Sequence, residues 1–246
     1  MNDPSIPAFE RRNAAFLFLL MAIGLVGVAT LLLAPLEQLL PPGVDVPRAV
    51  LLIQPAVFVV LCSLLGWWAA PKVGLDAPVI GGLAGRGDWL GALRDALPLA
   101  LAGGVLSAAV LVAYGLGTAG YFAEQSASLE LPMVTRVGYG GVAEEILTRW
   151  GLMSLLAFAA LRLGLSRPAA HWTGNLVAAL LFALGHLPAL YALVDPPAWL
   201  VGVVMLANTS VGLIFGWVFA RRGLEGAMIA HACAHLFAIP VIVMLG

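Results

Sequence analysis

Ionisable side chains interrupt three long apolar stretches of this chain, and their spacing suits acid–base chemistry. In the first stretch Glu144 and Glu145 are adjacent, and Arg149 follows Glu145 by four residues. Residues four apart share one face of a helix, so Glu145 and Arg149 are expected to form an ion pair. Glu144 lies about 100° further round the helix and stays free to move a proton. The alternative interpretation is a structural ion pair plus an isolated acid.

Histidines occur in two further apolar stretches. Phe182 and His186 are four residues apart, and so are His231 and His235. Taken alone, His186 is better explained by a hydrogen bond to a neighbouring helix. Two imidazoles on one helix face favour a functional role, either as a pair of hydrogen-bond donors or as two ligands of a metal ion.

The composition places these residues in a membrane. Hydrophobic residues make up 62% of the 246 residues and charged residues 10%, whereas soluble domains carry about a quarter charged residues. A soluble enzyme, a nucleic-acid-binding protein and a disordered chain are therefore excluded. The only cysteines, Cys62 and Cys233, lie in apolar runs and form neither a disulfide framework nor a CxxC motif.

Seven stretches contain the roughly 20 apolar residues that a helix needs to cross a bilayer. They cover residues 14–35, 49–70, 97–117, 131–161, 173–191, 198–220 and 224–245. We therefore predict an all-α fold, a polytopic membrane helical bundle of about seven transmembrane helices. Its loops are short and no repeat is visible, so residues 1–246 are expected to form a single membrane-embedded domain.

The basic residues predict the orientation of this bundle. Arg48 alone falls in a loop on one side, and two arginines lie within the fourth span. The other nine of the twelve fall on the opposite side: Arg11, Arg12, Lys72, Arg86, Arg94, Arg162, Arg167, Arg221 and Arg222. The positive-inside rule then places the N-terminus in the cytoplasm.

The cost of burying charge predicts that the ionisable residues converge. Each ionisable group at mid-bilayer costs about 2.5–3.5 kcal/mol. The least costly arrangement gathers the acids of the fourth span and the histidines of the fifth and seventh around one water-containing cavity. His186 lies toward the outer end of its span and His231 toward the cytoplasmic end, so the helices must tilt to bring them together.

Taken in order, these motifs resemble those of a known family. Glu144-Glu145-xxx-Arg149, Phe182-xxx-His186 and His231-xxx-His235 are similar to motifs of the CAAX-protease and bacteriocin-processing (CPBP, or Abi) family of intramembrane proteases. This family includes the type II CAAX prenyl endopeptidase. The resemblance covers about residues 131–240, and residues 131–245 are expected to form the catalytic core.

The resemblance implies a role for each residue. Glu144 would be the general base that activates a water, helped by His186. Glu145, Arg149 and Phe182 would position the site, and His231 with His235 would stabilise the oxyanion. The prenyl endopeptidase has asparagine where this chain has His235, a departure that concerns specificity for prenylated proteins more than the hydrolysis itself.

The cofactor is left open by the sequence. Glu144, His186, His231 and His235 offer one carboxylate and three imidazoles, which is a suitable set for zinc or another divalent metal. A metal-free glutamate mechanism is equally consistent with the resemblance. The HExxH arrangement of ordinary zinc proteases is absent.

The predicted function is that of an intramembrane CPBP-type endopeptidase, classed by its family as a metalloprotease. It would cleave a membrane-associated peptide or protein, in contact with the lipid bilayer and with no nucleic acid as partner. Its active site would be accessible from the cytoplasmic side of a prokaryotic cell membrane. The alternatives are a non-catalytic membrane scaffold or immunity-type protein of the same family, or a proton-coupled transporter.

Overall fold

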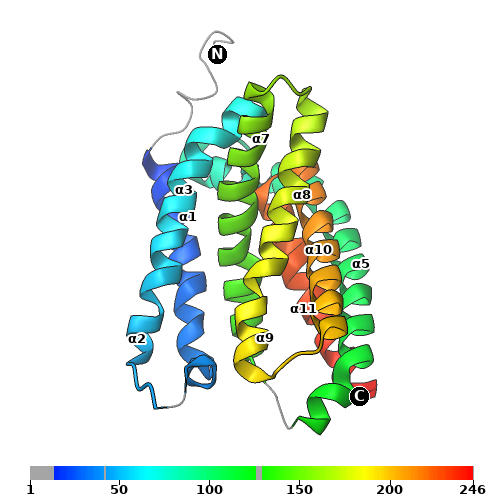
Figure 1. The fold of residues 1–246 in the computed structure, drawn as a ribbon. Helices are drawn as coiled ribbons and strands as arrows, with labels where there is room; N and C mark the ends of the chain where they lie inside the picture. Colours follow the sequence, from blue (N-terminus) through cyan, green and yellow to red (C-terminus); the bar gives the residue numbers. More distant parts are fainter. Residues whose placement is uncertain (1–13, 42, 126–128, 246) are drawn as a thin grey trace, which may run out of the picture.

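The computed structural model describes residues 14–41, 43–125 and 129–245, and this part of the chain is helical without any strand (Figure 1). Its long helices are α1 (Ala14–Ala29), α3 (Ile53–Val73), α5 (Trp89–Glu124), α8 (Arg167–Gly185), α10 (Ala198–Arg222) and α11 (Leu224–Leu245). Shorter elements are η1 (Thr30–Leu33), η2 (Leu36–Leu39), α2 (Arg48–Leu51), α4 (Pro78–Gly81), η3 (Gly82–Arg86), α6 (Met133–Thr135), η4 (Arg136–Glu144), η5 (Ile146–Met153), α7 (Ser154–Arg162) and α9 (Leu187–Leu193).

Six helical stretches are long and apolar enough to cross a membrane. They are Ala14–Leu33, Arg48–Val73, Trp89–Glu124, Arg167–Leu193, Ala198–Arg222 and Leu224–Leu245. The predicted all-helical membrane bundle is confirmed. The predicted count of seven spans is not confirmed, because the run from Met133 to Arg162 is helical but is not among these six. It carries charged residues in its middle, and its status as a seventh span stays a prediction.

The helical run that carries the acidic motif has an unusual backbone. Elements η4 and η5 are π-helical, with hydrogen bonds from residue i to i+5, and Glu145 lies between them. The sequence predicted only a tilted span here. Such widened turns are rare and often occur at functional sites. They also bring this segment close to its neighbours, since Gly141 lies against Ala232 of α11 and Gly151 against Cys62 of α3.

The basic loops that the structure describes meet at one end of the bundle, as their distribution in the sequence predicted; Arg11 and Arg12 lie outside the described residues. The N–H of Leu224, where α11 begins, donates to the Asp76 carbonyl at 3.0 Å, and His171 of α8 donates to the Val73 carbonyl at 2.8 Å. Arg48 lies at the opposite end, paired with Glu37 at 2.6 Å. Which end faces the cytoplasm stays a prediction.

The core is centred on Trp150 of η5, which is fully buried against α1 and α3. Its indole N–H donates to the Ser63 carbonyl at 3.1 Å, and Phe16 packs on it with ring centroids 5.6 Å apart. Gly66 of α3 touches the same indole, so a methyl group there would collide with Trp150. The helices pack this closely only because residue 66 has no side chain.

We expect Gly66→Ala to lower the free energy of unfolding by about 1–3 kcal/mol, the usual result of overpacking a tight core. Gly117→Ala is the matched control, because Gly117 is a helical glycine of α5 with open space around its Cα. Alanine there improves helix propensity and does not destabilise. Thermal unfolding of both variants in detergent measures the difference. Equal unfolding temperatures for the two would contradict the close packing of α3 on Trp150.

Candidate active site

A buried carboxylate forms the centre of the candidate site. The Glu145 side chain is completely buried, and its Oε1 forms an ion pair with Arg149 and a hydrogen bond with His231. Arg149 Nη1 lies 3.1 Å away on the same helical run, and His231 Nδ1 lies 2.8 Å away on α11. The ion pair that the spacing predicted is present, and the carboxylate also joins two helices that are far apart in the sequence.

Arg149 extends this network to α10. Its Nη2 donates to the Gly212 carbonyl at 2.9 Å, and its Nη1 also donates to the Thr148 hydroxyl. The guanidinium carbon lies 5.0 Å from the centre of the Phe182 ring and 5.4 Å from that of Phe215. Hydrogen bonds and aromatic faces thus compensate a cation that is almost fully buried.

His231 is held so that one of its nitrogens faces the interior of the site. Its Nδ1 bonds Glu145, and its ring stacks on Phe215 with centroids 4.4 Å apart and planes 19° apart. Its Nε2 lies 3.6 Å from where a Cβ on Gly140 would be, and Nε2 of His235 lies 3.3 Å from the same point. The two imidazoles therefore converge on Gly140 of η4, where a side chain is missing.

His186 joins this group through Phe182, although it lies near the opposite end of its helix. The Phe182 ring contacts both His186, at 4.6 Å between centroids, and His231, at 6.1 Å. His186 Nδ1 donates to the Phe182 carbonyl at 2.8 Å, at the break between α8 and α9. The sequence places His186 and His231 toward opposite ends of their spans, and the structure nevertheless brings both rings into contact with Phe182.

Glu144 has a different environment from Glu145. Its side chain is half-buried, and its carboxylate makes no hydrogen bond or ion pair with any residue that the structure describes. It lies within electrostatic range of Tyr139 and Arg149. The structure therefore gives the two adjacent glutamates separate environments, one locked in a network and one unpaired. Direct contact between Glu144 and the histidines is not observed.

The arrangement does not form a metal site. Across the described ranges, no three His, Cys, Asp or Glu side chains are grouped so that they could hold a metal ion. The possible ligand set of Glu144, His186, His231 and His235 is therefore not grouped around one point in the described structure. We therefore derive no chemical step through a metal.

Several residues at the site were not predicted from the sequence. Gly140 provides the space beside the imidazoles, Phe215 stacks on His231, and the Gly212 carbonyl accepts from Arg149. The pair Gly140-Gly141, so close to two glutamates, was an available signal for a close approach to another helix. Nothing in the sequence distinguishes Phe215 from the other aromatic residues of its span.

Comparison with known proteins bears on the segment that contains this network. Residues 126–237 match the family model described as type II CAAX prenyl endopeptidase Rce1-like, and they include every candidate residue from Glu144 to His235. The matched segment spans slightly less than half of the chain. No curated protein and no solved structure matches the chain.

The resemblance to the CPBP family is thereby confirmed, and members of this family are generally intramembrane proteases. The six apolar helices and the family match together indicate an integral membrane protein whose residues 126–237 are similar to the Rce1-like CAAX proteases.

Proposed function

We propose that this protein is an intramembrane endopeptidase that cleaves a membrane-associated peptide or protein with a water activated by Glu144. One observation carries the proposal: His231 and His235 direct their Nε2 atoms to one point beside Gly140, on the helical run that also bears Glu144. Convergent imidazoles and a carboxylate that has no partner among the described residues are groups that peptide hydrolysis can use.

The reaction divides into two steps. Glu144 takes a proton from the water while the water oxygen bonds to the carbonyl carbon, and the carbonyl electron pair moves to the oxygen. The resulting oxyanion accepts a hydrogen bond from the His235 imidazole; His231, whose Nδ1 donates to Glu145, can donate a second one from Nε2 only as a doubly protonated ring. The proton held by Glu144 then passes to the nitrogen of the leaving peptide, the carbon–nitrogen bond breaks, and the carboxylate is regenerated.

The hydrogen bonds around the rings support these roles. The Phe182 carbonyl only accepts, so His186 carries its proton on Nδ1 and a neutral ring presents the Nε2 lone pair, which suits an acceptor that orients water. His235 Nδ1 is buried and has no hydrogen-bond partner among the described residues. An orphaned N–H is rarer than an unused lone pair, which favours the proton on Nε2, the nitrogen that faces Gly140.

We expect Glu144→Gln to reduce cleavage about 10²–10⁴-fold, the usual contribution of a general base. Its thermal unfolding should match wild type, since the Glu144 carboxylate makes no bond with described groups. Glu145→Gln is the matched control: it leaves the buried Arg149 without its counter-charge and should lower stability by about 3–5 kcal/mol. Purified protein in liposomes is assayed with a fluorogenic farnesylated CAAX peptide, the same peptide without the prenyl group, and a lipid-anchored peptide.

The combination of activity and stability separates the alternatives. Cleavage by wild type but not by Glu144→Gln, with unchanged unfolding, supports the proposal. Cleavage retained in Glu144→Gln would refute Glu144 as the base. A wild-type protein that binds these peptides but hydrolyses none of them would favour a non-catalytic scaffold of the same family.

The adjacent glycines of η4 test the convergence of the imidazoles. A methyl group on Gly140 would lie 3.3–3.6 Å from the two Nε2 atoms, in the space that the proposal assigns to the carbonyl oxygen of the substrate. We expect Gly140→Ala to slow cleavage roughly 10–100-fold with little change in stability. Gly141→Ala, which presses on Ala232 of α11 at 3.1–3.2 Å, should instead lower the unfolding temperature. Unaltered cleavage by Gly140→Ala would contradict the assignment of this space to the substrate.

A further inference from the structure

A second site lies at the basic end of the bundle, away from the candidate active site. A pocket of about 300 Å³ opens between α8 and α10. Its polar lining is basic, with Arg167, Arg221 and His171, and Trp172 and Trp217 complete its walls. We propose that this pocket binds the headgroup of an anionic phospholipid from the adjacent leaflet. The proposal is independent of the catalytic function.

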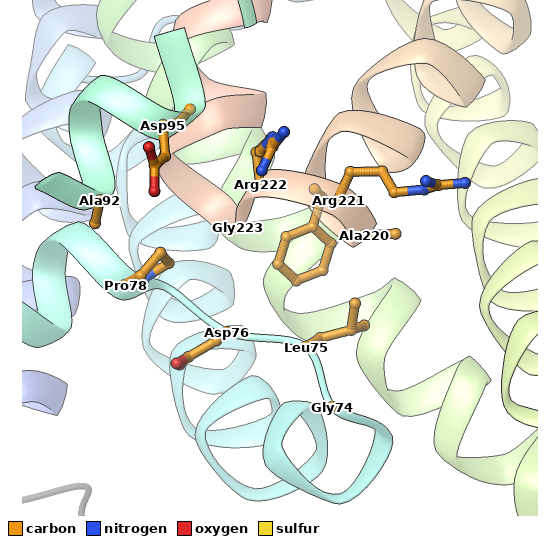
Figure 2. Close-up of a pocket in the computed structure, with 12 residues that line it drawn as sticks. Gly74, Leu75, Asp76, Pro78, Ala92, Asp95, Ala220, Arg221, Arg222 and Gly223 are labelled. Atoms are coloured by element: carbon orange, nitrogen blue, oxygen red, sulfur yellow. The ribbon is translucent and has the colours of Figure 1, made fainter. Parts of the chain in front are cut away.

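The two arginines have no carboxylate partner in the part of the chain that the structure describes. No Asp or Glu lines the pocket, and neither Arg167 nor Arg221 has a carboxylate within ion-pair distance among the described residues. Figure 2 shows the Arg221 side chain pointing away from Asp76 and Asp95 of a neighbouring pocket, whereas Arg222 lies on the side of Asp95. Arg167 and Arg221 both line this cavity, and guanidinium groups are complementary to a phosphate diester.

The position of the pocket selects a lipid as its occupant. Arg167 is the first residue of α8 and Arg221 lies in the last turn of α10, so both are at the ends of apolar helices, where headgroups lie. Trp172 is 56% exposed beside them, and tryptophan is enriched at this level of membrane proteins. Basic pockets between membrane helices bind anionic headgroups for these reasons.

An apolar stripe leads from the pocket along α8. Trp172, Leu176, Leu180 and Leu184 follow one another at four-residue spacing, and they are 56%, 48%, 41% and 48% exposed. Side chains at this spacing lie one above the other on a helix. A phospholipid whose headgroup is bound by the two arginines can place its acyl tail along this stripe. A soluble phosphate has no acyl tail and cannot make this contact.

The test measures lipid selectivity of the full-length protein in liposomes. Electron spin resonance compares the association of spin-labelled phosphatidylglycerol with that of spin-labelled phosphatidylcholine. We expect wild type to prefer phosphatidylglycerol, and Arg167→Gln and Arg221→Gln each to reduce the preference roughly fivefold. Arg222→Gln is the matched control, because it removes the same charge from the next residue, which lines the other pocket. It should keep the wild-type preference.

Three additional measurements distinguish lipid binding from misfolding and from binding of a soluble anion. Arg221→Lys should retain most of the preference, and thermal unfolding of each variant excludes misfolding as the cause of a loss. Inorganic phosphate at millimolar concentration should not displace the labelled lipid. Displacement by phosphate would reassign the pocket to a soluble anion and overturn the proposal. An equal loss in Arg222→Gln, or no loss in Arg167→Gln and Arg221→Gln, would also overturn it.

Discussion

A carboxylate buried in a membrane bundle must be compensated where it lies, and this constraint organises the candidate site. Glu145 has no access to solvent, so the cost of its charge is offset only by Arg149 at 3.1 Å and His231 at 2.8 Å. Arg149 in turn requires the Gly212 carbonyl on α10. One charge thus joins three helical segments, and moving any of them would leave a buried group without a partner.

The same network separates the roles of two adjacent glutamates. The Glu145 carboxylate binds an arginine and a histidine, so its role is structural. The Glu144 carboxylate has no hydrogen bond or ion pair with any described residue, so it is available for proton transfer. Fixing His231 through Nδ1 also determines that its Nε2 faces Gly140, together with that of His235. The positioning of the imidazoles is therefore a consequence of satisfying a buried acid.

Close helix contact makes this network sterically feasible. The π-helical turns of η4 and η5 carry glycines that let the backbone approach α11 and α3 directly, at Ala232 and Cys62. Larger residues at these positions would hold the helices apart and lengthen the hydrogen bonds of Glu145. The arginines at the basic end of the bundle do not need partners inside the protein, because they lie at helix ends and reach headgroups or water.

The sequence by itself determined the membrane class, the gathering of basic loops at one end and the pair Glu145–Arg149, because composition and four-residue spacing are local properties. It predicted seven spans, and six helical stretches of the described structure are long and apolar enough to be spans. It also indicated which motifs belong together. Tertiary structure alone decided that His231 bonds Glu145, that Phe182 bridges His186 and His231, and that Gly140 faces both imidazoles. It also decided that the four expected metal ligands do not form a metal site. These outcomes depend on helix tilt, rotation and π-helical turns, which arise from packing between segments distant in the chain and leave no periodic signal within any one of them.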